Sequence, residues 1–260
     1  VLMGTTDVVM DHQEKKELQR KFINPELCDI TEALVYTEPY NDERGRNRVF
    51  PPIADFVKEK LYEDQGLHCE VAKLKMDFMT RAQSLIHGDL HTGSIFINEE
   101  STKVFDPEFC FYGPMGYDIG NVIANMIFAW ANGDAAGAAD FCKWVEDVLV
   151  DVINMTKEKM EKYYDEHVTD TMCRNELYKK YYMDTIIEDT SAVAGLELIR
   201  RIVGMANVKD ITTIADEAKR ARAEKICITA AIDFIKNRSD KKCGKCFLKT
   251  LKDAIAEVDA

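Results

Sequence analysis

The chain has 260 residues, a hydrophobic content of 46% and a formal net charge of −12 at pH 7. This size and composition suffice for one large domain or two small ones with a buried core. The acidic balance argues against nucleic acid as a partner, because neutralisation of phosphates dominates that affinity. No apolar run is long enough for a membrane span and no secretory signal pattern is present, so we expect no membrane contact and a cytoplasmic location.

Eight cysteines are scattered along the chain, mostly in apolar or helical contexts that are typical of reduced core thiols. Only Cys243 and Cys246 are closely spaced, as a single CxxC. One such pair without a second is weak evidence for a metal or redox site. We interpret it as a solvated turn with free thiols, and a metal site or a disulfide is the alternative.

The first third of the chain alternates helical patterns with loops. Residues 1–22 form a charged helical stretch, and a new helix is expected at Pro25 with Asn24 as its N-cap. The polar residues 37–52 contain three prolines and three arginines. They predict a surface loop, with a loop that covers substrate as the alternative. Apolar side chains recur on one helical face over two further segments, residues 53–64 and 70–85.

Short β-type runs then replace the helical period. They lie at residues 85–86, 95–97 and 103–105, and Asn98–Ser101 has the composition of a hairpin turn. Beyond Tyr117 the pattern is helical throughout. The predicted helices span residues 116–132, which are apolar nearly all round, and then 140–163, 173–187, 190–208, 211–237 and 246–258. The sequence therefore predicts a mainly α fold with a small β-hairpin.

Acidic residues follow the β-type runs. Asp89 comes two residues after His87 and lies between Gly88 and Gly93, which permit tight backbone geometry. A carboxylate fixed there can accept or orient the proton of a substrate hydroxyl. The alternative is that Asp89 caps a turn and His87 is a core histidine. That alternative does not account for the acids after the returning strand, including Asp118.

Asp106 and Glu108 flank Pro107, and two hard oxygen ligands at this spacing suit Mg²⁺ that shares phosphate oxygens. A pair of solvated acids is the alternative. We expect the pair to be buried by the aromatic residues around it, which are Phe105, Phe109, Phe111 and Tyr112. Tyr112-Gly113-Pro114 is interpreted as a turn that shapes the pocket floor, and plain packing is an equal alternative.

Arg200 and Arg201 are adjacent in a stretch that is otherwise apolar apart from Glu197. Consecutive helical residues diverge by about 100°. Two neighbouring guanidinium groups in a buried helix therefore need acidic or phosphate partners. They pair either with Glu197 and other carboxylates or with a phosphorylated substrate.

Several motifs resemble those of known kinases. HGDLHTGS followed by DPEF resembles the catalytic loop and metal motif of small-molecule kinases related to aminoglycoside and choline kinases. Ser94 departs from their usual HxDxxxxN pattern. HGDLHTGSI, VFDPEF with FYGP and GYDIG, and NPELCDITE together resemble the 5-methylthioribose kinase family, through most of the chain.

The resemblance implies transfer of the ATP γ-phosphoryl group to the anomeric hydroxyl of 5-methylthioribose, in methionine salvage. It implies Asp89 as catalytic base or hydroxyl-orienting group, and Mg²⁺ held by Asp106 and Glu108 on the nucleotide. Arg200 and Arg201 would meet the sugar and the transferred phosphoryl group. Three residues would support the loop: His87, Ser94 and Asp118, whereas His91 would be structural. The family further implies a homodimer.

The sequence contains no Gly-rich loop followed by a strand and no strand lysine of the kinase type. We therefore expect residues 1–260 to be the C-terminal catalytic lobe of a protein-kinase-like fold, with the N-terminal lobe absent. Catalytic and metal loops would occupy residues 84–120 and a helical substrate-binding part residues 121–260. Such a chain would have weak or no activity alone. The alternatives are another hydroxyl kinase, acting on choline, homoserine or an aminoglycoside, or a non-catalytic fragment that binds a ligand or a partner.

Overall fold

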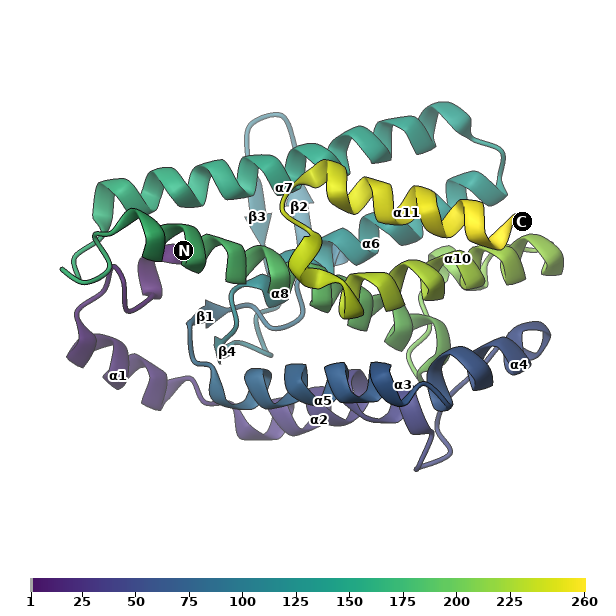
Figure 1. Ribbon diagram of the computed structural model, residues 1–260, viewed down its shortest axis with the longest axis horizontal. Helices are drawn as coiled ribbons and strands as arrows, with labels where there is room; N and C mark the ends of the chain where they lie inside the picture. Colours follow the sequence, from purple (N-terminus) through teal and green to yellow (C-terminus); the bar gives the residue numbers. More distant parts are fainter. Residues whose placement is uncertain (1) are drawn as a thin grey trace.

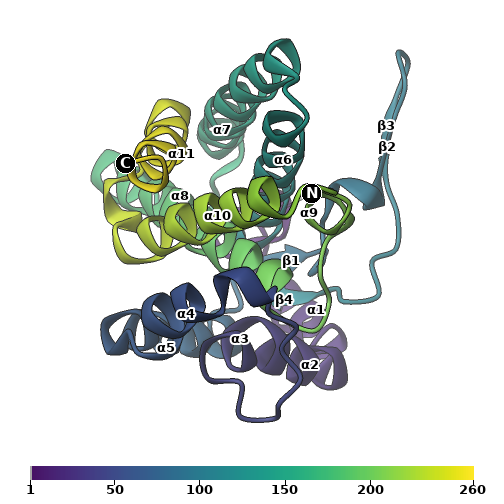
Figure 2. The ribbon, with the colours of Figure 1, turned by 90° about the vertical axis from the view of Figure 1, so that its right-hand side faces the viewer.

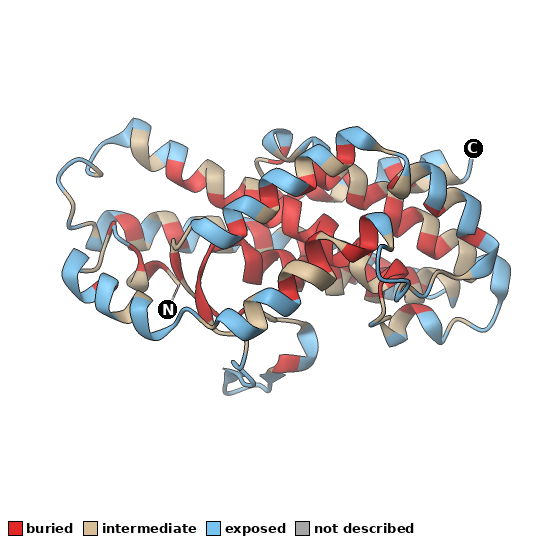
Figure 3. Ribbon diagram, turned by 90° about the horizontal axis from the view of Figure 1, so that it is seen from below, coloured by how far each residue is buried: buried red, intermediate tan, exposed pale blue. Residues whose placement is uncertain are grey.

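Three long helices form the centre of the computed structural model, which describes residues 2–260. They are α6 (Gly116–Ala135), α8 (Glu176–Val203) and α10 (Glu217–Lys236). Most of the fully buried side chains come from these helices and from the elements packed directly against them, as the concentration of red in Figure 3 shows. The prediction that the helix beginning at Gly116 is buried on most of its surface is confirmed.

Two glycines allow α6 and α8 to approach closely. A Cβ atom on Gly116 would lie 2.5 Å from the Cβ of Asp189, and one on Gly120 would lie 2.7 Å from the carbonyl oxygen of Thr190. Real Cβ atoms do not make such short contacts, so these positions require glycine. Because the two glycines are four residues apart, they lie on the same face of α6. The crossing of α6 and α8 is therefore fixed by backbone contact.

The remaining helices cover two sides of this centre. α7 (Ala139–His167) and α11 (Gly244–Val258) lie on one side, and α2 (Pro25–Tyr36) and α5 (Gln65–Thr80) lie on the other (Figure 1). Shorter elements complete the chain: α1 (His12–Lys21), α3 (Glu38–Asn41), α4 (Ala54–Val57), α9 (Lys209–Thr212), a π-helical turn (Lys58–Tyr62) and 3₁₀ turns at Met3–Thr5, Pro51–Ile53, Thr92–Ser94 and Arg238–Asp240. None of the helices within residues 2–260 is long and apolar enough to cross a membrane.

Two small antiparallel sheets lie among the helices. β1 (Ser84–Ile86) pairs with β4 (Phe111–Gly113), and β2 (Ile95–Ile97) pairs with β3 (Thr102–Val104) as a hairpin. Figure 2 shows the hairpin projecting away from the helices. This mostly helical chain with small antiparallel sheets confirms the prediction of a mainly α fold that contains a β-hairpin. The interpretation of Tyr112-Gly113-Pro114 as a turn is wrong, because Tyr112 and Gly113 belong to β4.

Two predicted helices are a single helix. The break expected at residues 188–189 is absent, and α8 runs without interruption from Glu176 to Val203. Its polar central residues are satisfied inside the fold, since Asp189 forms an ion pair with Arg81 and the Thr190 hydroxyl donates to the carbonyl oxygen of Ile186. The helix ends at Val203, five residues before the predicted Val208.

The first helical prediction is also wrong in extent. Residues 1–22 were expected to be helical throughout, but a 3₁₀ turn and α1 account for the helical part of the described residues. Residues 37–52 form a loop that contains the short helix α3, and Arg44 and Arg46 both pair with Glu38 inside it. The amide of Arg48 donates to the carbonyl oxygen of Val203, 2.8 Å away. The loop therefore lies against the C-terminal end of α8.

Candidate active site

The pairing of β1 with β4 brings the two motif loops together. Ile86 lies opposite Phe111, so the residues that follow β1 run beside those that precede β4. Gly88 has a φ of +84°, and a Cβ there would lie 2.2 Å from the carbonyl oxygen of Phe109. Only glycine combines this left-handed conformation with so close an approach. The backbone of the HGD loop (residues 87–89) thus contacts the backbone of the DPEF loop (residues 106–109).

Asp118, in the first turn of α6, is hydrogen-bonded to the backbone of the HGD loop. Its side chain is 2% exposed, Oδ2 accepts a hydrogen bond from the His87 amide at 2.7 Å, and Oδ1 accepts one from the Gly88 amide at 2.9 Å. Burial raises the pKa of Asp118, and the two amide donors oppose that shift. Both carboxylate oxygens of Asp118 thus fix the backbone of the loop from inside the fold.

Asp89 faces the C-terminal end of α8. Nη2 of Arg200 donates to Oδ1 of Asp89 at 3.0 Å, and the Nη2 of Arg201 lies 3.9 Å from the same oxygen. The structure therefore brings together residues that are 111 positions apart in the sequence. Asp89 is partly exposed, with 27% of its side chain accessible, so a substrate can still reach it.

Glu197 lies beneath both arginines. Its carboxylate is 1% exposed, accepts from Nε of Arg201 at 2.9 Å and also pairs with Arg200. Burial alone would raise the pKa of Glu197, but the two guanidinium groups outweigh it and leave that pKa below its usual value. One buried carboxylate thus offsets part of the charge of two arginines. Of the two kinds of partner considered for these arginines, the structure shows the carboxylates of Glu197 and Asp89.

His87 and His91 both form hydrogen-bonding contacts with other residues of the two motif loops. Nε2 of His87 lies 2.9 Å from the carbonyl oxygen of Phe105, and Nδ1 accepts from the Asp89 amide at 3.3 Å. A carbonyl oxygen only accepts, so these contacts assign the proton to Nε2 of His87. Nε2 of His91 lies 3.2 Å from the Ser94 hydroxyl and 4.0 Å from Asp89. Ser94 is buried, and its hydroxyl contacts a histidine.

The DPEF loop is more exposed to solvent than the sequence analysis predicted. Asp106, Pro107 and Glu108 are all exposed, so the expectation that aromatic side chains bury this pair is wrong. Phe105 is itself 39% exposed, and stacks on Phe96 of the hairpin with ring centroids 4.4 Å apart. It packs along the hairpin and leaves the acids uncovered.

The backbone of Asp106 has a φ of +65°, in the left-handed region that residues other than glycine rarely adopt. Such strain persists where surrounding contacts hold it. Two exposed carboxylates on a held backbone fit a hard cation that takes its other ligands from water or phosphate. Within residues 2–260 no group of three or more His, Cys, Asp or Glu side chains is arranged to hold a metal by itself.

Asn24 is the site residue that the sequence analysis missed. It was predicted to cap α2, and it does precede Pro25, but its side chain makes no capping hydrogen bond. With a φ of +38°, it instead donates from Nδ2 to the carbonyl oxygens of Glu108 at 2.8 Å and Cys110 at 3.2 Å. The amide of Tyr112 also donates to the carbonyl oxygen of Phe22. Only the resemblance in NPELCDITE could have pointed to this position.

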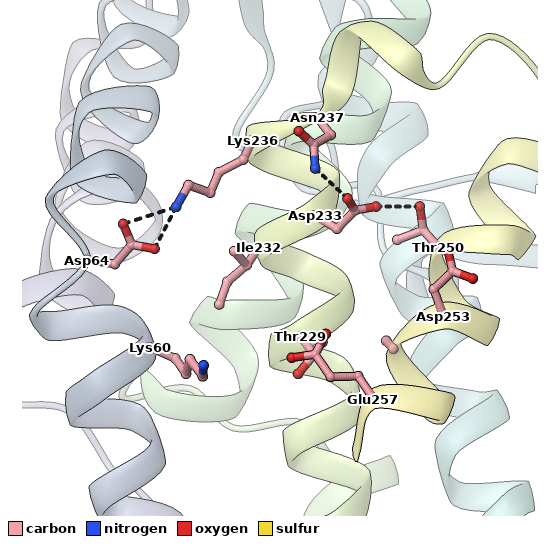
Figure 4. A pocket seen from close by; sticks show the side chains of 11 residues that line it. Lys60, Asp64, Thr229, Ile232, Asp233, Lys236, Asn237, Thr250, Asp253 and Glu257 are labelled. Atoms are coloured by element: carbon pink, nitrogen blue, oxygen red, sulfur yellow. Dashed lines mark hydrogen bonds and ion pairs between the residues drawn. The ribbon is translucent and has the colours of Figure 1, made fainter. Parts of the chain in front are cut away.

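A separate polar pocket of about 330 Å³ lies between the segment around Asp64 and the helices α10 and α11 (Figure 4). None of the predicted site residues lines it. Its charged groups are largely paired with one another or with groups nearby: Lys236 with Asp64 at 2.8 Å, and Asp233 with the Thr250 hydroxyl at 2.7 Å. Because none of the predicted site residues lines this pocket, the candidate site is the cluster around Asp89.

Comparison with known proteins shows which enzymes this chain is similar to. Residues 22–149 match the Phosphotransferase enzyme family, a span that contains both motif loops. A methylthioribose kinase of Bacillus pumilus is 36% identical over 235 residues, which are 90% of this chain and 58% of that protein. Methylthioribose kinase 1 of Oryza sativa subsp. japonica is 37% identical over 247 residues, 88% of this chain and 56% of that protein. The chain thus spans less than two thirds of the length of these relatives.

Proposed function

We propose that this chain, a homologue of the methylthioribose kinases over about nine tenths of its length, forms part of an enzyme that phosphorylates 5-methylthioribose. The ATP γ-phosphoryl group would pass to the 1-hydroxyl, giving 5-methylthioribose 1-phosphate in methionine salvage. The contact between Arg200 and Asp89 supports the proposal most directly. In this contact a partly exposed carboxylate lies beside a guanidinium group, which supports roles for Asp89 as the base and Arg200 as a phosphate-binding group.

Asp89 is proposed to receive or orient the proton of the sugar hydroxyl. Its carboxylate follows β1 directly and is aligned by the loop that Asp118 holds. Arg200 forms an ion pair with Asp89 at 3.0 Å and so fixes the direction in which this carboxylate points. As the proton moves to Asp89, the guanidinium can turn its donors to the oxygens of the transferred phosphoryl group. Arg201 would bind the sugar or the phosphoryl group beside it.

Asp106 and Glu108 are proposed to hold Mg²⁺ together with the phosphates of ATP. Their exposure fits this role, because a cation with only two protein ligands must be reached by the nucleotide and by water. When bound, Mg²⁺ neutralises charge on the phosphates during transfer. His87, Ser94 and Asp118 would support the loop, and the contact of Ser94 with His91 argues against a direct metal ligand at that position.

The chain is further proposed to be the C-terminal lobe of a protein-kinase-like fold, over residues 1–260, with the nucleotide held mainly by a second lobe. The two motif loops would be the catalytic part, at residues 84–120, and the helices of residues 121–260 the sugar-binding part. A homodimer in the cytoplasm rests on family resemblance alone. Positioning supplies much of phosphoryl-transfer catalysis, so the complete protein is the right material for any activity test.

A coupled assay of ADP release by the complete protein tests the proposal. The substrates to compare are 5-methylthioribose, choline, homoserine and an aminoglycoside, each with Mg²⁺ and ATP. Preference for 5-methylthioribose, with a sugar 1-phosphate identified as product, is the expected result. Preference for another acceptor would assign a different hydroxyl kinase. Calorimetric binding of the sugar without ADP release would leave only a ligand-binding role.

A further inference from the structure

The thiol groups of Cys243 and Cys246 are in contact. Cys243 is the N-cap of α11 and has an extended backbone, and Cys246 is the third residue of that helix. The two Sγ atoms are 3.2 Å apart, and both residues are partly exposed. The expectation of free, partly exposed thiols is confirmed, but the expectation of a turn is wrong, because the segment begins a helix of 15 residues.

The backbone around the pair is held by three helices. The Gly244 amide donates to Oδ1 of Asn154 on α7 at 2.9 Å, and a Cβ on Gly244 would lie 2.3 Å from the carbonyl oxygen of Val150. Lys242 pairs with Glu188 on α8 at 2.7 Å. Lys241, which is 8% exposed, pairs with Asp233 on α10. These contacts hold the two thiols near each other, and a disulfide requires their Sγ atoms to approach from 3.2 Å to about 2.05 Å.

The environment of the pair favours a thiolate on Cys246. Burial would raise the pKa of Cys246, but hydrogen bonds from Cys243 and from backbone amides, with the charge of Lys241, leave that pKa below its usual value. The start of α11 also directs its positive end at this residue. Burial raises the pKa of five other cysteine thiols: Cys28, Cys110, Cys142, Cys173 and Cys227.

We propose that Cys243 and Cys246 are a redox-active dithiol that closes to an intramolecular disulfide by exchange with a low-molecular-weight disulfide such as oxidised glutathione. The Cys246 thiolate attacks one sulfur of that disulfide, whose S–S bond breaks and releases one small thiol. Cys243, after losing its proton, attacks the Sγ of Cys246 and releases the second small thiol. The protein loses two electrons and two protons, and the small disulfide gains both.

A zinc site is less well supported at this pair. Structural zinc takes four ligands, but no cluster of three or more His, Cys, Asp or Glu side chains suited to a metal occurs in the described part of the chain. The cysteine pair also lies away from the candidate active site around Asp89. Glu188, which anchors Lys242, precedes Arg200 by twelve residues, about 18 Å along α8 at the usual helical rise.

Glutathione redox buffers applied to the full chain, followed by acid quenching, alkylation and trypsin, test the proposal. As the buffer becomes more oxidising, two of the eight thiols should no longer be alkylated, and the mass of the intact protein before alkylation should fall by about 2 Da. Trypsin cuts after Lys245, so the peptides 243–245 and 246–249 should remain joined until a reductant is added. Separate alkylated peptides at every glutathione ratio, or a linkage to another cysteine, would overturn the proposal.

Serine variants separate the roles of the two thiols. Cys243→Ser should accumulate a mixed disulfide with glutathione at Cys246, because the second thiol that resolves it is gone. Cys246→Ser should react much more slowly, and Cys69→Ser, at an exposed thiol, should behave as the unaltered protein. Equal reactivity of the two single variants at positions 243 and 246 would contradict the assignment of Cys246 as the attacking thiol. None of these readouts depends on kinase activity, so they stand apart from the proposed function.

Discussion

Nη2 of Arg200 donates hydrogen bonds to both Asp89, at 3.0 Å, and Glu197, at 3.1 Å, and Nε of the same guanidinium also donates to Glu197. Arg201 shares Glu197 but lies 3.9 Å from Asp89. The two arginines are therefore not equivalent, although they are adjacent in the sequence. Their different distances from the proposed base lead to different expected effects.

Arg200→Ala should lower kcat/KM for 5-methylthioribose more than Arg201→Ala does. Removal of one donor to a developing oxyanion costs about 3–4 kcal/mol, a loss of 10²–10³ in rate. Arg200→Lys should recover only part of this loss, because lysine lacks the planar fork of donors. Steady-state kinetics of the complete protein measure the three values, and a kcat/KM near the unaltered value for Arg200→Ala would remove this residue from the site.

Asp89→Asn should reduce kcat by about 10²–10⁴ while leaving the fold intact, since the amide can still accept from Arg200 but cannot take a proton. Asp118→Asn is the variant to compare with Asp89→Asn. It should lower both activity and thermal stability, because an amide nitrogen cannot accept from the loop amides of His87 and Gly88. Thermal melts alongside turnover distinguish the two, and retained turnover in Asp89→Asn would exclude Asp89 as the base.

Asn24→Gly tests whether the side chain of Asn24 positions the metal loop. Glycine retains the left-handed backbone but removes both hydrogen bonds to the loop, so the Mg²⁺ concentration for half-maximal activity should rise by about tenfold. The KM for the sugar should change little. Asp42→Gly is the matched control, because Asp42 is also left-handed, with a φ of +48°, but lies in the 37–52 loop. An unchanged Mg²⁺ dependence in Asn24→Gly would argue for a purely structural role.

Glu197→Gln should destabilise the fold at neutral pH and have less effect in acid. The folded pKa of Glu197 lies below its unfolded value, so its contribution is fully present above about pH 4.3 and is lost as pH falls through the folded pKa. Breaking a buried pair costs about 3 kcal/mol or more. Urea unfolding of the unaltered chain and the variant at pH 7 and at decreasing pH measures the difference. A gap that is constant with pH would count against ionised Glu197 as its source.

Local sequence patterns were sufficient to predict most of the helices and one hairpin turn. Apolar periodicity located the helices after Gly116, and composition alone located the turn of the β2–β3 hairpin. The continuity of α8 could not be predicted in this way, because Asp189 is tolerated mid-helix only through its ion pair with Arg81. β4 was missed since its partner β1 lies far back in the chain and its three residues include a glycine.

In the candidate site, too, residues in local motifs could be predicted, whereas contacts between distant residues could not. Motif spacing identified Asp89, Asp106 and Glu108 as a group, and the arginines were recognised by their charge in an apolar helix. The role of Asn24 depends on contacts with carbonyl oxygens 84 and 86 residues away, which no local pattern encodes. The exposure of Asp106 likewise follows from the direction in which the hairpin projects, not from the aromatic residues beside it.

The backbone contact at Gly116 and Gly120 has a consequence for how the protein matures. A slip of α8 along α6 by one turn would move Arg200 about 5.4 Å and separate it from Asp89. Partly folded chains in which this crossing has not formed would contain all the motif residues and still lack an organised site. Recovery of activity after refolding should therefore follow the docking of α8, a contact between distant parts of the chain, and lag behind the recovery of helical structure.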